Sequence, residues 1–476
     1  MHEQPPRDAT PLPSLRLTAR QAIAAVTDTA VELTPGTAGA PPAPTPHAPP
    51  PPPDGPLGWH GYDAARRRAR DRTGEEESVV TALATLGGTD AVVLAFEFGF
   101  LGGSLGERTG DRLEAAYTEA RERRLPLVSL IATGGSRMQE GMRALSQLQR
   151  VARQSALNRA AGLPQIAVVR DPTTGGGWAT LGAGADVILA LPKAQVGFAG
   201  SRVRPPDADP HAYSAEGQFA AGQIDAVVPA DALRTTLQRW LRLLNTANPP
   251  PTAPPHPAPV PFALGTTHLP ETGWDAVRRA RDARRPRAEA YLRAYFDDWE
   301  EINGDRCGGR DPGMRCGFGH RDGRTIAFAA QCGTATRPAG FRTATRLIRL
   351  ADRLGTPVLT LIDTPGAAND AEAERAGAGA AIADTFAALA AAHVPVTSLL
   401  IGEGGSGGAL ALAAPNRLWA TPDSYFSVIA PEMAAAILKR GPDAIHHTAD
   451  QLHIRPQDLL ELGIIRNITE PEPAGG

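Results

Sequence analysis

The residues of this sequence best suited to chemistry are glycines, which gather in four short turns. The turns are centred on Gly135, Gly176, Gly366 and Gly407, and each follows a run of apolar residues. A glycine-rich turn that enters a helix leaves backbone N–H groups without an intrahelical acceptor, and the helix dipole adds partial positive charge there. Such a turn stabilises an anion. A single turn of this kind is most often only a tight connection, so the argument depends on its repetition.

The four turns form two pairs with the same spacing. In each pair the second turn follows the first by 41 residues, from 135 to 176 and from 366 to 407. Two loops that each deliver an N–H group to one point form an oxyanion hole, which stabilises negative charge on an oxygen atom in a transition state. We therefore expect two oxyanion holes, with donors at Gly135, Gly175 and Gly176 in the first and at Gly366, Gly407 and Gly408 in the second. Neighbouring glycines expected to contact the substrate are Gly134, Gly404 and Gly405.

Other chemistries find little support in the sequence. It contains no Gly-x-x-x-x-Gly-Lys-Ser/Thr motif for a nucleotide phosphate. Ser406 lies in a literal Gly-x-Ser-x-Gly pattern, but no matching His and Asp pair is evident, and the first half has no serine at that place. Three cysteines are too few for a disulfide framework or a four-cysteine zinc site. We expect no bound metal and a reducing compartment, which makes the cytoplasm the expected location.

The elements that must position these turns also repeat. The apolar runs LPLVSLI and TPVLTLI contain Pro126 and Pro357, which are 231 residues apart, and Pro164 and Pro395 precede the next runs at the same offset. Runs of this length are typical of buried strands, and segments 111–124 and 341–355 have the spacing of amphipathic helices. Strand, glycine turn, helix and strand in alternation predict an α/β fold, built here from two copies of one domain.

Two proline-rich stretches divide the chain. They predict a disordered arm over residues 1–56 and a semi-rigid linker over residues 247–267. The globular domains are then expected over residues 57–246 and 268–470.

Charge and hydropathy exclude two classes of partner. The 476 residues include 48 basic and 51 acidic side chains, and this net charge of -3 lacks the basic excess of a general nucleic-acid binder. Neither a basic start followed by an apolar core nor a run of about 18 apolar residues is present, so we expect no membrane partner. Only Lys193 and Lys439 are lysines.

Several long segments of the sequence resemble a known family. FEFGFLGGSLGERTGDRLEAA, IATGGSRMQEGMRAL and RDPTTGGGWATLGAGADVILALPKAQVGFAGSRV are similar to the β subunit of the bacterial acetyl-CoA carboxylase carboxyltransferase. WEEINGDR, TLIDTPGAANDAEAE and VPVTSLLIGEGGSGGALALAAPNRLWATPDSYFSVIAPE are similar to its α subunit. The resemblance implies fused β and α subunits with two tandem crotonase-like domains, the ββα superhelix fold.

The resemblance also implies an activity. The chain is expected to move the carboxyl group from N-carboxybiotin to acetyl-CoA or another short acyl-CoA, giving malonyl-CoA, the first step of fatty acid synthesis. Negative charge then develops on the biotin ureido oxygen and on the thioester oxygen, so two holes are needed, and the freed biotin itself takes the α-proton. Which hole serves which substrate stays open.

Partners follow from the same resemblance. Neither lysine lies in a Met-Lys biotinylation motif, so biotin is expected on a separate carrier protein, charged by a separate biotin carboxylase. The active site is expected between the first domain of one protomer and the second domain of another, in a homodimer or larger assembly. Arg137, Arg202 and Arg204 are candidates for the CoA phosphates, but the interpretation we favour for each is a surface or structural arginine. No other nucleotide is expected.

Two departures from the family leave alternatives open. The four-cysteine zinc ribbon of many β subunits is absent, and TPGAAND in the second half replaces a more familiar sequence. One alternative is a biotin-independent crotonase-type enzyme that uses Glu140 or Glu403 as a base. The other is a non-catalytic paralogue that acts as a scaffold subunit.

Overall fold

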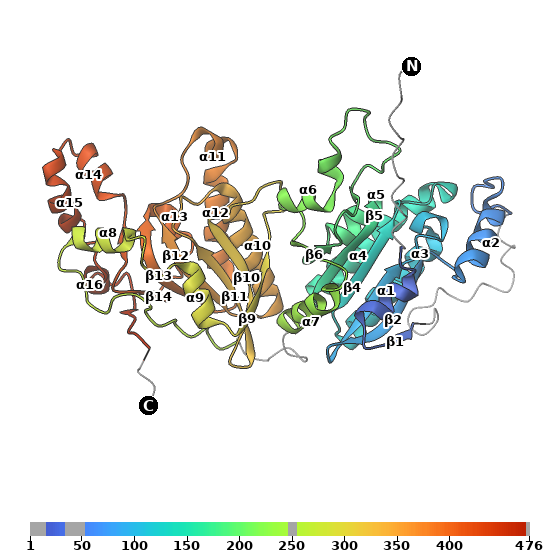
Figure 1. Ribbon diagram of the computed structural model, residues 1–476, viewed down its shortest axis with the longest axis horizontal. Helices are drawn as coiled ribbons and strands as arrows, with labels where there is room; N and C mark the ends of the chain where they lie inside the picture. Colours follow the sequence, from blue (N-terminus) through green and yellow to red (C-terminus); the bar gives the residue numbers. More distant parts are fainter. Residues whose placement is uncertain (1–15, 34–52, 246–254, 473–476) are drawn as a thin grey trace, which may run out of the picture.

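The computed structural model describes residues 16–33, 53–245 and 255–472, and it shows two halves side by side, each a twisted sheet covered by helices (Figure 1). The sheet of the first half has the order β1-β2-β3-β4-β5-β6-β8, with β7 paired to the end of β5. Its first three strands pair antiparallel, and the rest pair parallel. The strands are β1 Thr29–Glu32, β2 Val79–Leu86, β3 Thr89–Phe96, β4 Leu127–Thr133, β5 Gln165–Thr174, β6 Val187–Ala190, β7 Val196–Gly197 and β8 Ala226–Val227.

The second half repeats this topology. Its sheet has the order β16-β14-β13-β12-β11-β10-β9, with β15 paired to the end of β13. β12 and β13 match β4 and β5 at the offset of 231, which confirms the repeat. The strands are β9 Asp298–Ile302, β10 Met314–Arg321, β11 Arg324–Gln331, β12 Val358–Thr364, β13 Val396–Gly405, β14 Leu418–Ala420, β15 Tyr425–Ser427 and β16 Asn467–Ile468.

The helices cover the sheets with apolar faces, as the sequence pattern predicts. In α10, Phe341, Leu347 and Ile348 are completely buried, while Arg346 and Arg353 on another side of the helix pair with Asp225 and Asp186 of the first half. The helices of the first half are α1 Ala19–Val26, α2 Tyr62–Thr73, α3 Glu107–Arg123, α4 Met142–Ala160, α5 Gly175–Gly177, α6 Ala215–Ala220 and α7 Leu233–Leu244. Those of the second half are α8 Gly273–Arg281, α9 Ala288–Tyr295, α10 Pro338–Leu354, α11 Ala371–Arg375, α12 Ala378–Ala391, α13 Ser406–Leu410, α14 Pro431–Ile437, α15 Ile445–Gln451 and α16 Pro456–Glu461. None of the described helices is long and apolar enough to cross a membrane.

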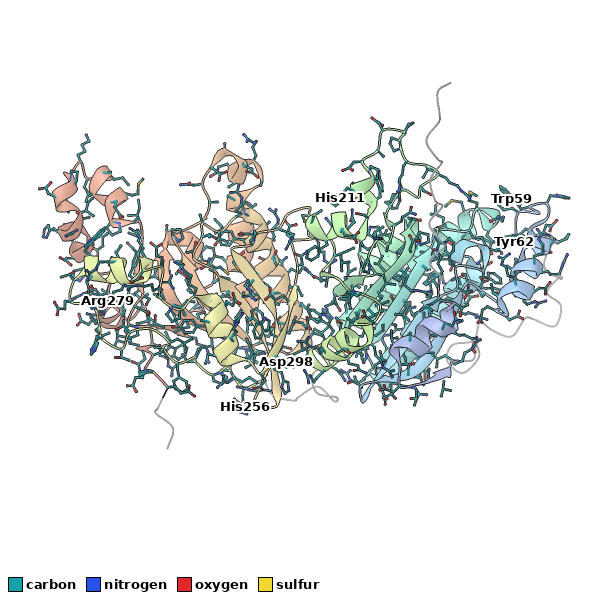
Figure 2. The ribbon with its side chains drawn as sticks, viewed as in Figure 1. Trp59, Tyr62, His211, His256, Arg279 and Asp298 are labelled. Atoms are coloured by element: carbon teal, nitrogen blue, oxygen red, sulfur yellow. The ribbon has the colours of Figure 1, made fainter. Side chains whose placement is uncertain are left out.

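The two halves meet at a packed seam. Trp240 of α7 contacts the ring of Phe318 of β10 edge-on, with centroids 6.5 Å apart. Asp298 of β9, labelled in Figure 2, forms an ion pair with Arg242 of α7. One cluster of buried apolar residues includes side chains of both halves. The halves therefore share a core.

The predicted disordered arm is wrong for residues 16–33. These residues form α1 and β1, and β1 pairs antiparallel with β2 at the edge of the sheet. Ala19, Ile23 and Val26 of α1 are buried against the first half, and Thr18 begins the helix with a capping box. The proline-rich composition that follows gave no information on this short amphipathic helix. Residues 1–15 and 34–52 of the predicted arm lie outside the described residues.

The predicted linker is wrong in its second part. Residues 255–264 lie along the second half, where Ala258 and Ala263 are buried. The carbonyl of Ala258 accepts a hydrogen bond from Thr397 at 2.9 Å, and that of Pro259 accepts one from Tyr295 at 2.8 Å. Proline cannot donate a backbone hydrogen bond, but Ala263 donates one to the carbonyl of Glu470 at 2.9 Å, so the segment is held through both carbonyl and N–H groups. Residues 246–254 lie outside the described residues.

Candidate functional site

The structure brings the two glycine turns of the first half together. They follow β4 and β5, which are parallel neighbours, so both turns leave the same edge of the sheet. A side chain on Gly135 would lie 3.5 Å from the Cα atom of Gly175 and 3.8 Å from the backbone nitrogen of Gly176. The approach is close enough for N–H groups of the two turns to reach one atom.

The second half has the same arrangement at the ends of β12 and β13. A side chain on Gly408 would lie 2.3 Å from the backbone nitrogen of Ala367, and one on Gly366 would lie 3.5 Å from the carbonyl oxygen of Gly405. Gly175 and Ser406, which are 231 residues apart, both adopt a left-handed φ, +64° and +53°. The second turn of each pair therefore has the same unusual backbone shape.

Three of the six predicted donors are already paired. The N–H groups of Gly135 and Gly366 donate to the hydroxyls of Thr133 and Thr364, at 3.0 and 3.1 Å. The N–H of Gly175 donates to the carbonyl of Phe198 at 3.1 Å. Two of these glycines, 135 and 366, adopt φ of +107° and +139°, so their role is to shape the turn.

The residue after each turning glycine is the next candidate donor. Ser136 and Ala367 form isolated parallel bridges with Leu105 and Thr336. In such a bridge the carbonyl of the preceding residue accepts a hydrogen bond and the N–H of the following residue donates one. The N–H of the bridged residue itself therefore points to the opposite side. In the described part of the chain neither N–H has a hydrogen-bond acceptor. Sequence reasoning missed both residues, although they repeat at the offset of 231.

The predicted donors Gly176 and Gly407 lie in the first turns of α5 and α13, where N–H groups have no intrahelical acceptor. A side chain on Gly407 would meet nothing within 4 Å, whereas one on Gly176 would meet Leu148 at 2.4 Å. Gly408 lies in the same first turn, but its Cα atom packs against Ala367. The open face of the second hole is therefore beside Gly407.

The predicted substrate-contacting glycines are packing positions. The N–H of Gly134 donates to the carbonyl of Gly102 at 2.9 Å. A side chain on Gly404 would lie 2.7 Å from the ring of Phe426, and one on Gly405 would lie 2.0 Å from the carbonyl oxygen of Pro365. Their small size lets β13 approach its neighbours.

The three arginines proposed for the CoA phosphates differ in exposure. Arg137 has an exposed fraction of 1% and forms ion pairs with Glu77 and Glu140, so its guanidinium has no free face for a phosphate. Arg204 stacks over the ring of Tyr213 at 4.1 Å and donates to a backbone carbonyl. Arg202 is exposed in the loop after β7.

A second group of cations lines a cavity of the first half. A cavity of about 200 Å³ between α2 and α3 has Phe100 in its wall, and Gly102 and Ser104, just after Phe100, accept hydrogen bonds from the first glycine turn. Its charged lining residues are Asp63, Arg66, Arg67, Arg70, Glu76 and Arg108. Sequence reasoning missed this cavity because only the fold brings the two helices together.

Neither glutamate proposed as a base is free. Glu140 is buried and accepts hydrogen bonds from Tyr62, Arg137 and the backbone N–H of Glu107. Glu403 accepts hydrogen bonds from Tyr425 at 2.7 Å and from Arg281 at 2.8 Å. Both carboxylates are therefore occupied by structural partners.

A buried ion pair supports the second hole. Asp363, which is completely buried, accepts a hydrogen bond from Arg285 at 2.6 Å and another from the backbone N–H of Glu403 at 3.1 Å. The carboxylate of Asp363 thus joins the end of β12 to β13, close to the two glycine turns of the second half. Burial, reinforced by the neighbouring carboxylate of Glu403, raises the pKa of Tyr425, which stays neutral. Among the described residues, no group of three His, Cys, Asp or Glu side chains is placed to hold a metal.

Comparison with known proteins identifies relatives of this chain. A family model described as acetyl co-enzyme A carboxylase carboxyltransferase-like matches residues 267–476. The acetyl-coenzyme A carboxylase carboxyl transferase subunits beta/alpha of Saccharopolyspora erythraea are 37% identical over 434 residues, covering 87% of this chain and 75% of that protein. Those of Salinispora arenicola are 39% identical, covering 85% and 75%. A probable biotin-dependent acyl-coenzyme A carboxylase beta3 subunit of Mycobacterium bovis is 35% identical, covering 85% and 82%.

Solved structures share the fold at lower identity. Transcarboxylase 12S, a hexamer solved with methylmalonyl-coenzyme A bound, superposes with a TM-score of 0.75 at 21% identity, covering 96% of this chain and 87% of that one. A single-chain, multi-domain long-chain acyl-CoA carboxylase superposes with a TM-score of 0.70 at 20% identity, covering 96% and 46%. These likenesses extend over both halves.

Proposed function

This chain belongs to the acetyl-CoA carboxylase carboxyltransferase family, and from that premise we propose that it transfers a carboxyl group from N-carboxybiotin to acetyl-CoA or another short acyl-CoA. The observation that carries the proposal is the duplicated hole. Each half offers one N–H from the residue after a turning glycine and one from the first turn of a short helix. A reaction that develops negative charge on two different oxygens uses two such sites.

The first hole consists of the N–H groups of Ser136 and Gly176, and the second of those of Ala367 and Gly407. One hole stabilises charge on the ureido oxygen as the carboxyl group leaves nitrogen, and the other stabilises the thioester oxygen as the α-proton leaves carbon. Loss of one such donor typically lowers the rate by about 10²- to 10³-fold. The new carbon–carbon bond replaces the nitrogen–carbon bond, and the proton ends on the ureido nitrogen. No side-chain base is needed, which fits the occupied carboxylates of Glu140 and Glu403.

The phosphates of CoA need cations near one hole. Arg202 and the arginines of the cavity between α2 and α3, Arg66, Arg67 and Arg108, lie on the first half, so we assign the acyl-CoA to that half. The second hole then takes biotin. This assignment replaces Arg137 as a phosphate ligand.

Biotin arrives on a separate carrier protein that a biotin carboxylase has charged. Lys193 and Lys439 lie in the sequences PKAQ and LKRG, which offer no biotinylation site. The three free cysteines fit a reducing compartment, and we place the reaction in the cytoplasm.

The active assembly is a homodimer or a larger oligomer in which the first half of one protomer faces the second half of another. Phe198 and Val428, at equivalent places after β7 and β15, are each 73% exposed beside the two holes. Met433 and Ile437 on α14 are also exposed. Such apolar side chains around a polar site are typical of a surface that another subunit covers.

The biotin-dependent reaction is tested by its reverse half. Purified chain is mixed with malonyl-CoA labelled in the free carboxyl group and with biocytin, and labelled carboxybiocytin is measured. Transfer that needs both substrates is expected, and methylmalonyl-CoA tested in parallel shows the acyl preference. Loss of the malonyl carboxyl group at the same rate without biocytin would favour a biotin-independent enzyme. No turnover of either thioester, with carrier-bound biotin as a further acceptor, would favour a scaffold subunit.

A further inference from the structure

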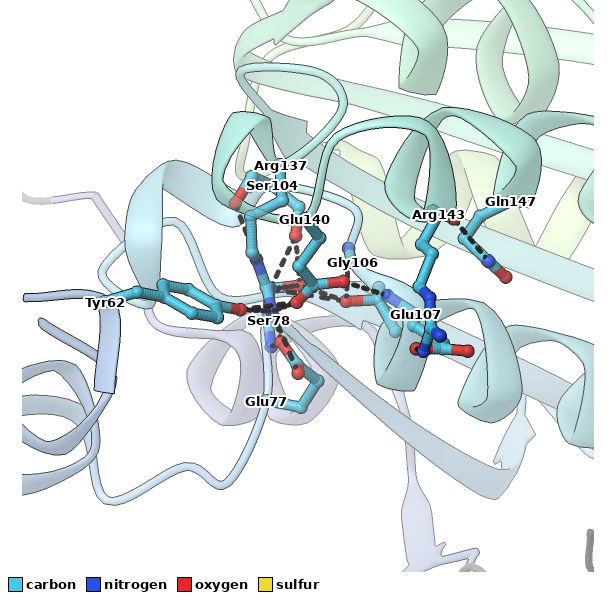
Figure 3. Close-up of polar contacts among 11 residues, drawn as sticks. Tyr62, Glu77, Ser78, Ser104, Gly106, Glu107, Arg137, Glu140, Arg143 and Gln147 are labelled. Carbon is cyan, nitrogen blue, oxygen red and sulfur yellow. Dashed lines mark hydrogen bonds and ion pairs between the residues drawn. The ribbon is translucent and has the colours of Figure 1, made fainter. Parts of the chain in front are cut away.

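A buried polar cluster lies directly behind the first hole. Arg137 follows Ser136 in the chain, and its guanidinium points toward Glu77, Glu140 and Tyr62 (Figure 3). There it forms ion pairs with Glu77, which is 1% exposed, and with Glu140. Its Nη2 atom donates to the carbonyl of Ser104 at 2.8 Å, and its Nη1 atom donates to the hydroxyl of Tyr62 at 3.2 Å.

The cluster ties three separate elements to the turn that carries Ser136. Glu77 precedes β2, and Ser104 lies in the loop before α3. Glu140 caps the start of α3 by accepting the backbone N–H of Glu107 at 2.6 Å. Tyr62 is the first residue of α2, and its hydroxyl donates to Glu140. A change at any of these contacts therefore reaches the backbone next to Ser136.

The cluster leaves no room for rearrangement. A side chain on Gly106 would lie 2.6 Å from both Arg137 Nη1 and Glu140 Oε1. Burial alone would raise the pKa of Glu77, but the charge and hydrogen bonds of Arg137 outweigh burial and hold that pKa below its usual value. Burial raises the pKa of Tyr62 to about 12, so its hydroxyl remains a donor.

The second half has no such arginine. The residue at the offset of 231 from Arg137 is Ala368, and the buried pair of Arg285 and Asp363 supports that hole from the strand side instead. The cluster of Arg137 is thus a feature of the first hole alone. The short helix α2, which lies at the outer end of the first half, contributes Tyr62 to it (Figure 2).

We propose that Arg137 is a positioning residue for the first oxyanion hole, and that α2, through Tyr62, is part of the support of that hole. The proposal rests on the proposed function. The side chain of Arg137 makes no contact with substrate. It fixes the direction of the Ser136 N–H by holding the next residue of the turn on both sides, through the backbone to Leu105 and through the guanidinium to Glu77, Glu140 and Tyr62.

The test uses two mild variants and one matched control in the full chain. Tyr62→Phe removes one hydroxyl, and Arg137→Lys keeps the charge but loses the fork that reaches both carboxylates. The control Arg353→Gln breaks another partly buried ion pair, with Asp186 at 2.6 Å. Because Asp186 immediately precedes β6, this pair lies at the opposite end of the strands from the holes.

The first readout is the kcat and KM of label transfer, per folded molecule. Tyr62→Phe is expected to lower kcat by about 3- to 10-fold, the worth of one hydrogen bond. Arg137→Lys is expected to lower kcat by about 100-fold, because a misplacement of about 1 Å has that effect. KM for malonyl-CoA should change less than kcat, and Arg353→Gln should keep both constants. Unchanged kcat per folded molecule in both variants would overturn the proposal.

The second readout does not depend on activity. Hydrogen exchange is measured on peptides that span residues 134–141, where the N–H groups of Arg137, Glu140 and Gly141 are hydrogen-bonded. Exchange there should become faster in Tyr62→Phe and Arg137→Lys and stay unchanged in Arg353→Gln. A wild-type chain without transfer would refute the proposed function alone. Exchange at 134–141 that is the same in all variants would refute the positioning role alone.

Discussion

Asp225 is the residue whose replacement should most clearly reveal how the two halves are joined. Its side chain is completely buried at the seam and accepts hydrogen bonds from Arg306 at 2.5 Å and from Arg346 at 2.8 Å. It also accepts the backbone N–H groups of Ile188 at 2.7 Å and of Asn303 at 2.9 Å. Ile188 belongs to the first half, and the other three partners belong to the second. One carboxylate therefore joins both sheets.

Asp225→Asn keeps the shape of the side chain and removes its charge. The amide NH₂ group then faces at least one donor, and two arginines lose their buried counter-ion. Removal of one partner from a buried ion pair costs about 3 to 5 kcal/mol. With a urea dependence of about 3 kcal/mol per M, the unfolding midpoint should fall by about 1 M or more.

The assay is urea unfolding followed by tryptophan fluorescence, with Arg349→Gln as the control. Trp240, which lies at the same seam, is one of the six tryptophans that contribute to the signal. Arg349 pairs with Asp384 on the surface at 3.2 Å, where both side chains are more than half exposed, so the control should change the midpoint little. A shift of the Asp225→Asn midpoint of less than about 0.2 M corresponds to well under 1 kcal/mol of unfolding free energy. Such a result would refute the view that this carboxylate holds the halves together.

Three further predictions follow from the described contacts. The pKa values of Asp225 and Glu77 are held below their usual values, because nearby arginines outweigh the effect of burial. Both groups therefore stabilise the fold at neutral pH, and this contribution is lost as the pH falls through their lowered pKa values. Thermal unfolding should therefore show a Tm that is flat near neutral pH and falls below about pH 4, and a Tm that is constant down to pH 3 would contradict this. Ile23→Ala should destabilise the first half by about 2 to 4 kcal/mol, since Ile23 of α1 is 5% exposed, and an unchanged Tm would show that α1 does not belong to the core. Gly379→Ala in α12 should stabilise the protein by about 0.5 to 1 kcal/mol, because a side chain there would meet nothing within 4 Å, and a lowered Tm would contradict that packing.

The repeat made much of the fold predictable from the sequence. The offset of 231 between Pro126 and Pro357 matches the offset between β4 and β12, and the predicted helices at 111–124 and 341–355 appear as α3 and α10 with shifted ends. The starts of both helices were missed because the preceding loop is fixed by contacts with the glycine turns. The ordered elements α1 and β1, which precede the first proline-rich stretch, were missed. The eight residues of α1 are too few for a clear helical periodicity, and the prolines nearby favoured a disordered arm.

The glycine turns were predictable from the sequence, but the direction of their N–H groups was not. Gly135 and Gly366 were identified correctly as turning points, yet their N–H groups donate to Thr133 and Thr364. The direction of an N–H group depends on φ and ψ and on the bridge with Leu105 or Thr336, none of which is readable from residue types. The partners of Arg137 were not predictable for a similar reason. Its partner Glu77 is 60 residues away in the chain, and only the fold shows that its charge is buried.

The central claim is that the two glycine turns of the second half together form a hole for a developing oxyanion. It is tested most directly by Gly407→Val. A side chain on Gly407 would meet nothing within 4 Å, so the fold should be retained, and we expect the two methyl groups of valine to crowd the open face of the turn beside the Gly407 N–H. Label transfer from malonyl-CoA to biocytin is measured against wild type and Gly379→Ala. The account predicts a loss of about 10²- to 10³-fold or more in kcat with an unchanged Tm. A folded Gly407→Val chain that transfers label at the wild-type rate would contradict it.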